Sequence, residues 1–184
     1  MTDKPITCME TEAFSFNLND GEKIEAIPVK REPDGTVFIT VDCLKKHYPM
    51  QQAGEYSDGY EHSDLRKALN GEILDRFPKE LRERMIPFEN GDMLRIPTER
   101  EIFGRNHWGK EEPESVEQFE AMKLRRNRIA LQGYNGAADW YWLQNQYVYS
   151  PAQAVHVNIT GEVCYSNTWY TTGVRPLFKI KNAQ

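Results

Sequence analysis

The residues whose types best suit binding in this 184-residue sequence are aromatic and small polar side chains in its last fifty positions. Trp140-Tyr141-Trp142-Leu143 opens this stretch, and Gly173-Val174-Arg175-Pro176-Leu177-Phe178 closes it. Tyrosine offers a large contact area with few rotatable bonds, while Asn, Ser and Thr offer adaptable hydrogen bonds. No glycine-rich phosphate loop or serine elbow accompanies them. The stretch therefore favours a recognition surface on a sheet over a reaction centre.

Alternation in this stretch predicts two strands, residues 154–160 and 162–166, joined by a turn at Gly161. Side chains expected on the inner face are Val155, Val157, Ile159, Val163 and Tyr165. Side chains expected to point outward are His156, Asn158, Thr160, Glu162, Cys164 and Ser166. A polar, aromatic loop over 167–172 follows. The outward set is the candidate surface.

The spacing of histidines and cysteines favours neither a metal site nor a catalytic pair. The other three histidines, His47, His62 and His107, lie far apart, and His156 is interpreted as a hydrogen-bonding surface residue. Three widely separated cysteines, Cys8, Cys43 and Cys164, argue against a disulfide framework and indicate reduced thiols. Acid pairs such as Glu111-Glu112 are interpreted as solvated loop charges. We expect no metal, no calcium site, no cofactor and no enzymatic activity.

Composition narrows the functional class further. A net charge of -5 argues against general affinity for nucleic acid, and the basic run Lys123–Arg128 is interpreted as a helix end. With 28% charged and 39% apolar residues and no long apolar run, we expect no membrane insertion. The start Met1-Thr2-Asp3-Lys4-Pro5 lacks the pattern of a classical secretion signal. The expected location after synthesis is the cytoplasm.

The first third of the chain must supply a sheet to position this surface. Alternation predicts strands around Phe14–Leu18 and Ile24–Pro28, and a β-branched run predicts another over Thr36–Val41. Asp42 is expected to cap a short helix that runs to Lys46. The region from Met50 to Tyr60 is interpreted as an ordered loop.

The middle of the chain predicts short helices. Ser63 is placed as the N-cap of a helix with one apolar face formed by Leu65, Leu69, Ile73 and Leu74. A second helix is expected from Pro78 to Pro87, and a brief strand over Leu94–Ile96. Thr98 and Glu101 form a capping box, and Gly104 ends that helix. Residues 111–120 are expected to form an amphipathic helix, with Val116, Phe119 and Met122 spaced for one face, or a lid-like insertion.

The order of several motifs carries a family resemblance. The motifs are Tyr60, Ser63-Asp64-Leu65-Arg66, Leu69-Asn70, Leu94 to Glu101, Trp140 to Leu143, Gly161 and Gly173-Val174-Arg175-Pro176. Their order resembles a bacterial and phage domain family of the C-type-lectin fold, which includes the variable proteins of diversity-generating retroelements. The resemblance implies one α+β domain over 1–184, with a twisted antiparallel sheet, short flanking helices and a variable ligand-binding segment over 140–178.

In that family, adenine-directed mutagenesis rewrites asparagine codons, which cannot become Trp, Gln, Glu, Lys or Met codons. The resemblance thus assigns scaffold roles to Trp140, Trp142, Gln144, Gln146, Gln153, Glu162 and Trp169. It leaves as candidate ligand-binding positions Tyr147, Tyr149, His156, Asn158, Thr160, Cys164, Ser166, Asn167, Tyr170, Thr171 and Thr172. The implied partner is an unidentified protein or surface ligand.

Two other functions stay open. The aromatic surface can pack against another subunit, as in a structural or assembly protein of a phage particle, with an oligomer as the result. The fold also occurs in formylglycine-generating oxidases, but Cys164 has no evident second cysteine nearby. Trp142 is expected to be a core residue. Arg175 is expected to be a structural arginine bonded to carbonyls or a carboxylate.

Overall fold

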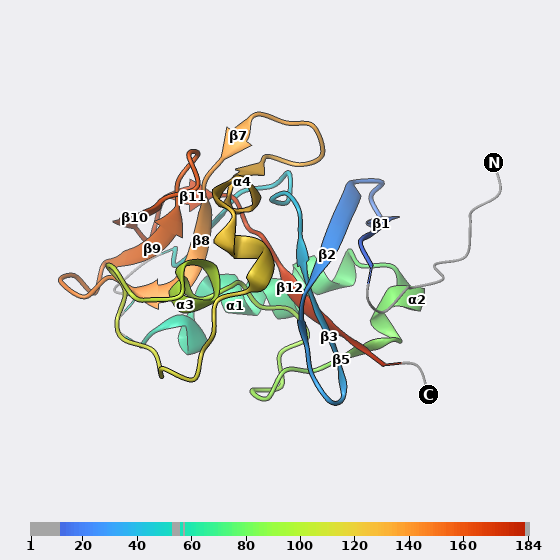
Figure 1. Ribbon diagram of the computed structural model, residues 1–184. Helices are drawn as coiled ribbons and strands as arrows, with labels where there is room; N and C mark the ends of the chain where they lie inside the picture. The colour runs from blue at the N-terminus through green and yellow to red at the C-terminus, as the bar shows by residue number, and fades with distance from the viewer. Residues whose placement is uncertain (1–11, 53–55, 57, 183–184) are drawn as a thin grey trace.

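The main sheet has five antiparallel strands, and the last strand of the chain lies inside it (Figure 1). The computed structural model describes residues 12–52, 56 and 58–182. The strands, in sheet order, are β1 (Phe14–Asn17), β2 (Lys23–Arg31), β3 (Gly35–Thr40), β12 (Leu177–Lys181) and β5 (Met85–Ile86). Phe38 on β3 is paired with Phe178 on β12. The two ends of the domain are therefore joined in one sheet.

A smaller sheet carries the segment singled out in the sequence. It contains β8 (Tyr141–Gln146), β9 (Gln153–Val157) and β10 (Val163–Asn167), with β9 in the middle. Two short pairs flank it: β4 (Tyr48–Pro49) with β11 (Thr171–Thr172), and β6 (Ala130–Leu131) with β7 (Ala138–Asp139). In Figure 1 the smaller sheet lies to one side of the main sheet, in orange. The molecule is therefore an α+β protein with antiparallel sheets.

The helices are short. They are η1 (Tyr60–His62), α1 (Asp64–Ala68), η2 (Leu69–Ile73), α2 (Lys79–Arg82), α3 (Glu99–Phe103), η3 (Glu120–Lys123) and α4 (Arg125–Arg128). The predicted caps are confirmed: Ser63 Oγ accepts the N–H of Arg66 at 3.1 Å, and Thr98 and Glu101 form a capping box. Gly104 ends α3 with φ 77°, a conformation that favours glycine.

Aromatic side chains link the main sheet to the helices. Phe38 and Phe178 stack with their ring centroids 5.8 Å apart, and Phe77 meets Phe178 edge-on, also at 5.8 Å. Trp142 is fully buried, as expected, and its indole N–H donates to the carbonyl of Tyr48 at 3.0 Å. Complete burial of a side chain such as Phe178 contributes about 1.5–3 kcal/mol to stability. The hydrogen bond joins β8 to β4, and Trp142 belongs to the same buried core as Phe38 and Phe178.

Arg175 confirms the prediction of a structural arginine. Its side chain is buried, and Nε donates to the carbonyl of Thr40 at 2.7 Å. Nη1 donates to the carbonyl of Asn127 at 2.9 Å and to the hydroxyl of Tyr141 at 3.2 Å. One guanidinium thus joins the end of β3, α4 and the start of β8.

Four sequence predictions of local structure were wrong in whole or in part. The helix expected from Pro78 to Pro87 ends at Arg82, and Met85–Ile86 form β5. Residues 42–46 form no helix, because Asp42 Oδ1 accepts the distant N–H of Leu131 at 2.9 Å and does not cap a following turn. Residues 94–96 form no strand but contribute one bridge, between Arg95 and Leu177. Residues 111–119 have no regular structure, and the helical turn begins only at Glu120.

None of the helices in the described part of the chain has the length and hydrophobicity needed to span a bilayer. Cys8 and the amino-terminal residues that were compared with a secretion signal lie outside the described residues, as does part of the loop expected between Met50 and Tyr60.

Candidate ligand-binding surface

Four aromatic side chains from β10, the residues after β8 and a separate loop meet at the smaller sheet and form what we term the aromatic cluster: Trp108, Tyr147, Tyr149 and Tyr165. Tyr147 and Tyr165 stack with centroids 3.8 Å apart and planes 9° from parallel. Tyr149 meets Tyr147 edge-on at 5.5 Å, and Trp108 meets Tyr165 edge-on at 5.7 Å. Tyr149 is 80% exposed and Trp108 39% exposed. The cluster therefore presents rigid aromatic area to solvent.

The loop that carries Trp108 is held by a buried carboxylate. Glu99, the first residue of α3, accepts the backbone N–H of His107 at 2.8 Å and of Trp108 at 3.0 Å on Oε1. Its Oε2 accepts the N–H of Gly109 at 2.8 Å and the amide of Asn106 at 3.2 Å. Hydrogen bonds to a charged group are each worth about 1.5–3 kcal/mol. Glu99 thus fixes the position from which Trp108 projects.

The same network reaches β8. Asn145 Oδ1 accepts the N–H of Glu99 at 2.7 Å, and its Nδ2 donates to Glu112 Oε2 at 2.8 Å. Asn106 donates to that same oxygen of Glu112 at 3.0 Å. A Cβ on Gly109 would lie 2.4 Å from Asn145 Cβ, so only glycine fits between Asn145 and Glu99. Strand, loop and helix are therefore joined beneath the cluster.

The ionisation of Tyr147 is disfavoured by its stacking partner. The hydrogen bond between the hydroxyls of Tyr147 and Tyr165 raises the pKa of Tyr147 to about 12. Burial lowers the pKa of His107, and the nearby Arg105 adds to this effect. Tyr147 therefore keeps its proton, and its ring face stays available to a ligand, over a wider pH range than an ordinary tyrosine.

His156 is not the surface residue expected from the sequence. Its ring is 4% exposed and lies edge-on to Trp140, with centroids 4.5 Å apart. Trp142 packs against another side at 6.0 Å, and Nε2 lies 3.1 Å from Ser166 Oγ. Burial lowers the pKa of His156 to about 4. The ring is therefore a neutral packing residue beneath Trp140.

The turn between β9 and β10 uses two candidate residues for its own structure. Asn158 Oδ1 accepts the N–H and the hydroxyl of Thr160 at 2.9 and 2.7 Å, and the N–H of Glu162 at 3.1 Å. Gly161 takes φ 76°, as expected of a turn. Because β9 ends at Val157, Ile159 is 53% exposed and does not continue the inner face.

The basic run packs against this turn. Arg125 Nε donates to the carbonyl of Thr160 at 2.8 Å, and Arg128 Nε donates to that of Gly161 at 3.0 Å. A second Arg128 nitrogen donates to the carbonyl of Met122 at 2.9 Å. Lys123 is the last residue of η3, as expected of a helix end, whereas Arg125–Arg128 form α4.

The remaining candidate positions differ in exposure. Thr172 is buried and donates to the carbonyl of Trp140 at 2.6 Å. Asn167 is half-buried and accepts from Gln153 at 3.2 Å, while Cys164 and Ser166 are half-buried on β10. Thr171 is exposed. Tyr170 is 48% exposed and meets the exposed Trp169 edge-on at 6.0 Å, which forms a second aromatic pair.

The sequence reasoning identified Tyr147 and Tyr149 but missed the two residues that complete the cluster. Tyr165 was placed on the inner face with Val155, which is its partner in the sheet register. Tyr165 does lie on that face, where it is half-buried and stacks on Tyr147, so its part in a recognition surface was not predicted. Trp108 lies in a separate loop, and its neighbour Gly109 was the available signal of a close backbone approach.

The buried Cys43 lacks the lowered pKa of a reactive thiol. Burial raises the pKa of the Cys43 thiol well above its usual value, and the charge of Asp139 adds to the effect, whereas reactive thiols have lowered pKa values. Cys43 and Cys164 are both free. His47 Nε2 lies 2.8 Å from Asp139 Oδ2. Among the described residues, no group of three or more His, Cys, Asp and Glu side chains can hold a metal ion.

Comparison with known proteins gives a family assignment and no closer relative. No curated protein matches the chain, and no solved structure does. Residues 34–182 match one family, which covers both the aromatic cluster and most of the main sheet. The chain therefore belongs to the family described as "Domain of unknown function (DUF6273)".

Proposed function

We propose that this chain is a ligand-binding protein whose recognition surface is centred on the aromatic cluster. The stack of Tyr147 on Tyr165, flanked by the exposed rings of Trp108 and Tyr149, is the observation that carries the proposal. Tyr and Trp dominate the energetics of binding surfaces because they bury large areas at small entropic cost. The buried Glu99 supports this function, since it holds the Trp108 loop in place before any ligand arrives.

The ligand we propose is a protein or another large surface ligand. The most exposed ring of the cluster, Tyr149, suits insertion into a partner's pocket. Polar backbone and side chains lie beside the rings, including Lys110, whose N–H is bonded to the carbonyl of Gln146 at 2.9 Å. An apolar centre with a polar rim is the usual composition of a protein interface.

We further propose that the fold is of the C-type-lectin type. In support, the main sheet is antiparallel, its strands from the two ends of the domain are neighbours, and short helices flank it. The segment over 140–178 then forms the ligand-binding face through the smaller sheet and its loops. Within that segment, Tyr147 and Tyr149 are the positions at which sequence variation would alter the aromatic cluster directly.

Variation at other candidate positions would disturb packing. His156 lies under Trp140, and Thr172 is bonded to its carbonyl. If the coding segment is diversified, we therefore expect substitutions to concentrate at the exposed positions Tyr149, Tyr170 and Thr171. Sequencing of the surrounding locus tests this. Diversification is supported by a gene for a reverse transcriptase together with a near-copy of the segment that differs only opposite template adenines. If both are absent, diversification is removed from the proposal.

The binding function is tested by screening the labelled protein on an array of bacterial surface proteins, with Trp108→Ala/Tyr149→Ala as the variant. Leu124→Ala is the control, because Leu124 is an exposed apolar residue at 51% outside the cluster. We expect signals that the double variant loses and the control keeps. Equal binding by wild type and double variant would exclude the aromatic cluster as the recognition surface.

An assembly function is the second candidate, because the exposed pair Trp169 and Tyr170 adds apolar area to the same segment. Light scattering at increasing protein concentration separates the two functions. A stable oligomer that Tyr149→Ala or Tyr170→Ala dissociates indicates assembly, whereas a monomer leaves these rings for an external ligand.

A further inference from the structure

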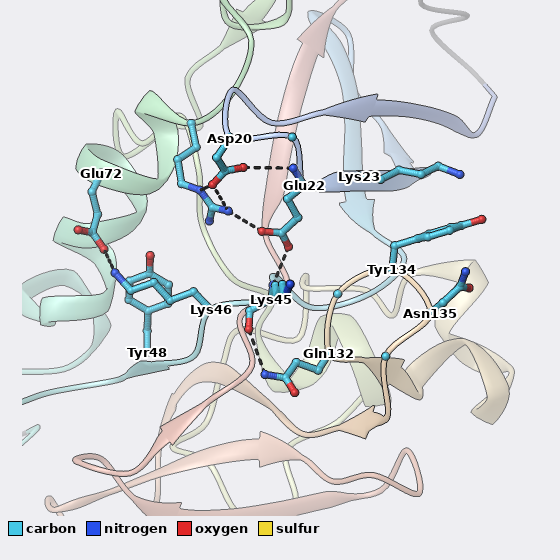
Figure 2. Close-up of a pocket in the computed structure, with 14 residues that line it drawn as sticks. Asp20, Glu22, Lys23, Lys45, Lys46, Tyr48, Glu72, Gln132, Tyr134 and Asn135 are labelled. Carbon is cyan, nitrogen blue, oxygen red and sulfur yellow. Dashed lines mark hydrogen bonds and ion pairs between the residues drawn. The ribbon is translucent and has the colours of Figure 1, made fainter.

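A large pocket lies apart from the aromatic cluster and shares no residue with it (Figure 2). Its volume is about 890 Å³, which is within the usual range for small-molecule sites. It is lined by the turn between β1 and β2 (residues 20–23), the segment 45–48, two side chains near η2, and the loop between β6 and β7 (residues 132–136). We term it the charged pocket. It is independent of the function proposed above.

Hydrogen bonds hold the walls of the charged pocket together. Glu22 Oε1 accepts the N–H of Lys45 at 2.6 Å, and Gln132 Nε2 donates to the carbonyl of Lys45 at 3.0 Å. The loop opposite is a tight turn in which Gly133 and Asn135 have φ values of 65° and 62°. Figure 2 shows Lys45 between the turn that carries Glu22 and the loop that carries Gln132. The pocket is therefore formed before a ligand binds.

The charges in the pocket leave one cation without a partner. Arg76 binds Asp20 at 2.8 Å and also Glu22, and Lys46 binds Glu72 at 3.0 Å. The ammonium of the exposed Lys45 forms no hydrogen bond or ion pair with any described residue. Arg76 Nη1 is buried and also has no acceptor within the described residues. The unused capacity of the pocket is thus cationic and hydrogen-bond donating.

The side walls present both donors and acceptors. Carboxylates of Asp20, Glu22 and Glu72 can accept further hydrogen bonds, and the side-chain amide of Asn135 can donate and accept. Lys23 Nζ lies 3.8 Å from the centre of the Tyr134 ring and holds that half-exposed ring at the rim. Hydroxyl groups suit such walls because each can donate and accept at once.

We propose that the charged pocket binds an acidic sugar, a small polyhydroxylated molecule whose single carboxylate pairs with Lys45. The carboxylate would form an ion pair with the unpaired ammonium of Lys45. The hydroxyls would form hydrogen bonds with the carboxylates and amides of the walls. A phosphate dianion fits less well, because it would carry two charges towards Asp20, Glu22 and Glu72.

The test is an amide NMR titration with D-glucuronate, D-glucose and inorganic phosphate at constant ionic strength. We expect D-glucuronate to shift the amides of residues 20–23, 45–46 and 132–136, and D-glucose to bind about fivefold or more weakly because it lacks the charge-assisted bond. Lys45→Gln should weaken D-glucuronate about fivefold to tenfold and leave D-glucose unchanged. Lys123→Gln, which changes an exposed lysine of η3, is the matched control and should behave as wild type.

A second variant guards against misfolding of the first. Asn135→Asp adds a negative charge to the loop at a φ that Asp tolerates, and it should weaken D-glucuronate while D-glucose binding persists. Equal binding of glucose and glucuronate overturns the assignment to Lys45. If phosphate shifts the same amides as strongly as D-glucuronate does, the pocket is a general anion site and the proposal of a sugar ligand is overturned. Absence of any shift with D-glucuronate at about 10 mM also overturns it.

Discussion

Trp108 is exposed, yet its backbone N–H is bonded at 3.0 Å to Glu99, a carboxylate with no solvent exposure. Trp108 provides contact area on the candidate surface, and Glu99 holds the Trp108 backbone in position. Glu99 contacts no part of the exposed ring face that a ligand would meet, and we therefore regard it as a positioning residue. Its substitution gives the first prediction.

Glu99→Gln should loosen the loop while the rest of the fold persists. The amide has one oxygen in place of two, so some of the four hydrogen bonds at Glu99 are lost, at about 1.5–3 kcal/mol each. We expect faster amide hydrogen exchange at residues 106–109 and a changed Trp108 fluorescence. Glu111→Gln, at an exposed neighbouring acid, is the control. Unchanged exchange in the Glu99 variant would contradict the positioning role.

Gly109→Ala should destabilise the protein through a steric clash. The added Cβ would lie 2.4 Å from Asn145 Cβ and 2.6 Å from Glu99 Oε2. Overpacking of this kind costs about 1–3 kcal/mol. Urea unfolding measures the loss, and Gly71→Ala serves as the control because a Cβ there meets nothing within 4 Å. Similar midpoints for the two variants would show that the loop can move aside.

Arg175→Lys should lose much of the stability of the fold although the charge is kept. A lysine cannot reproduce the planar set of bonds to the carbonyls of Thr40 and Asn127 and to the Tyr141 hydroxyl. Leaving such buried groups unpaired costs about 1–3 kcal/mol each. Thermal unfolding should reveal a large drop in Tm, and Arg126→Lys, at an exposed arginine, should change it little. A small drop for Arg175→Lys would mean that water replaces the lost bonds.

His156 should make stability depend on pH between 4 and its ordinary pKa. The folded pKa of about 4 lies below the ordinary value of 6.5, so the unfolded chain binds more protons in this window. The contribution of the neutral ring is complete above pH 6.5 and is lost as the pH falls towards 4, by about 3 kcal/mol in all. Urea unfolding at pH 7 and pH 5 measures it.

His156→Gln should flatten this dependence, and His62→Gln, at an exposed histidine, should preserve it. An equal slope in wild type and His156→Gln would assign the pH dependence to other groups.

Local chemistry explains which parts of the fold could be predicted. Ser63, the pair Thr98–Glu101 and Gly161 act on backbone groups within a few residues, so their roles are visible in the sequence. Asp42 failed as a predicted cap because its carboxylate bonds to Leu131, which is remote in sequence. Capping rules consider only neighbouring residues, so they cannot show that the N–H of a remote residue takes the carboxylate instead.

The candidate surface was predicted in part for a related reason. The alternation of residues assigned His156 to the outer face of the strand. It could not show that Trp140 packs over the ring on that face and buries it. The aromatic cluster unites a loop residue, Trp108, with strand residues such as Tyr165, and only the tertiary fold brings them together. Tyr147 and Tyr149 were predictable from the aromatic character of the segment, whereas Trp108 and Tyr165 as their partners were not.

The position of β12 between β3 and β5 bears on how the protein is made. During synthesis on a ribosome, β3 cannot pair with β12 until residues 177–181 have emerged. Until then Phe38 lacks its stacking partner Phe178. Contacts between distant parts of a chain form late and leave apolar strands open in the meantime. We expect nascent chains stalled before Leu177 to be protease-sensitive and to recruit chaperones, and release of the complete strand to end that state.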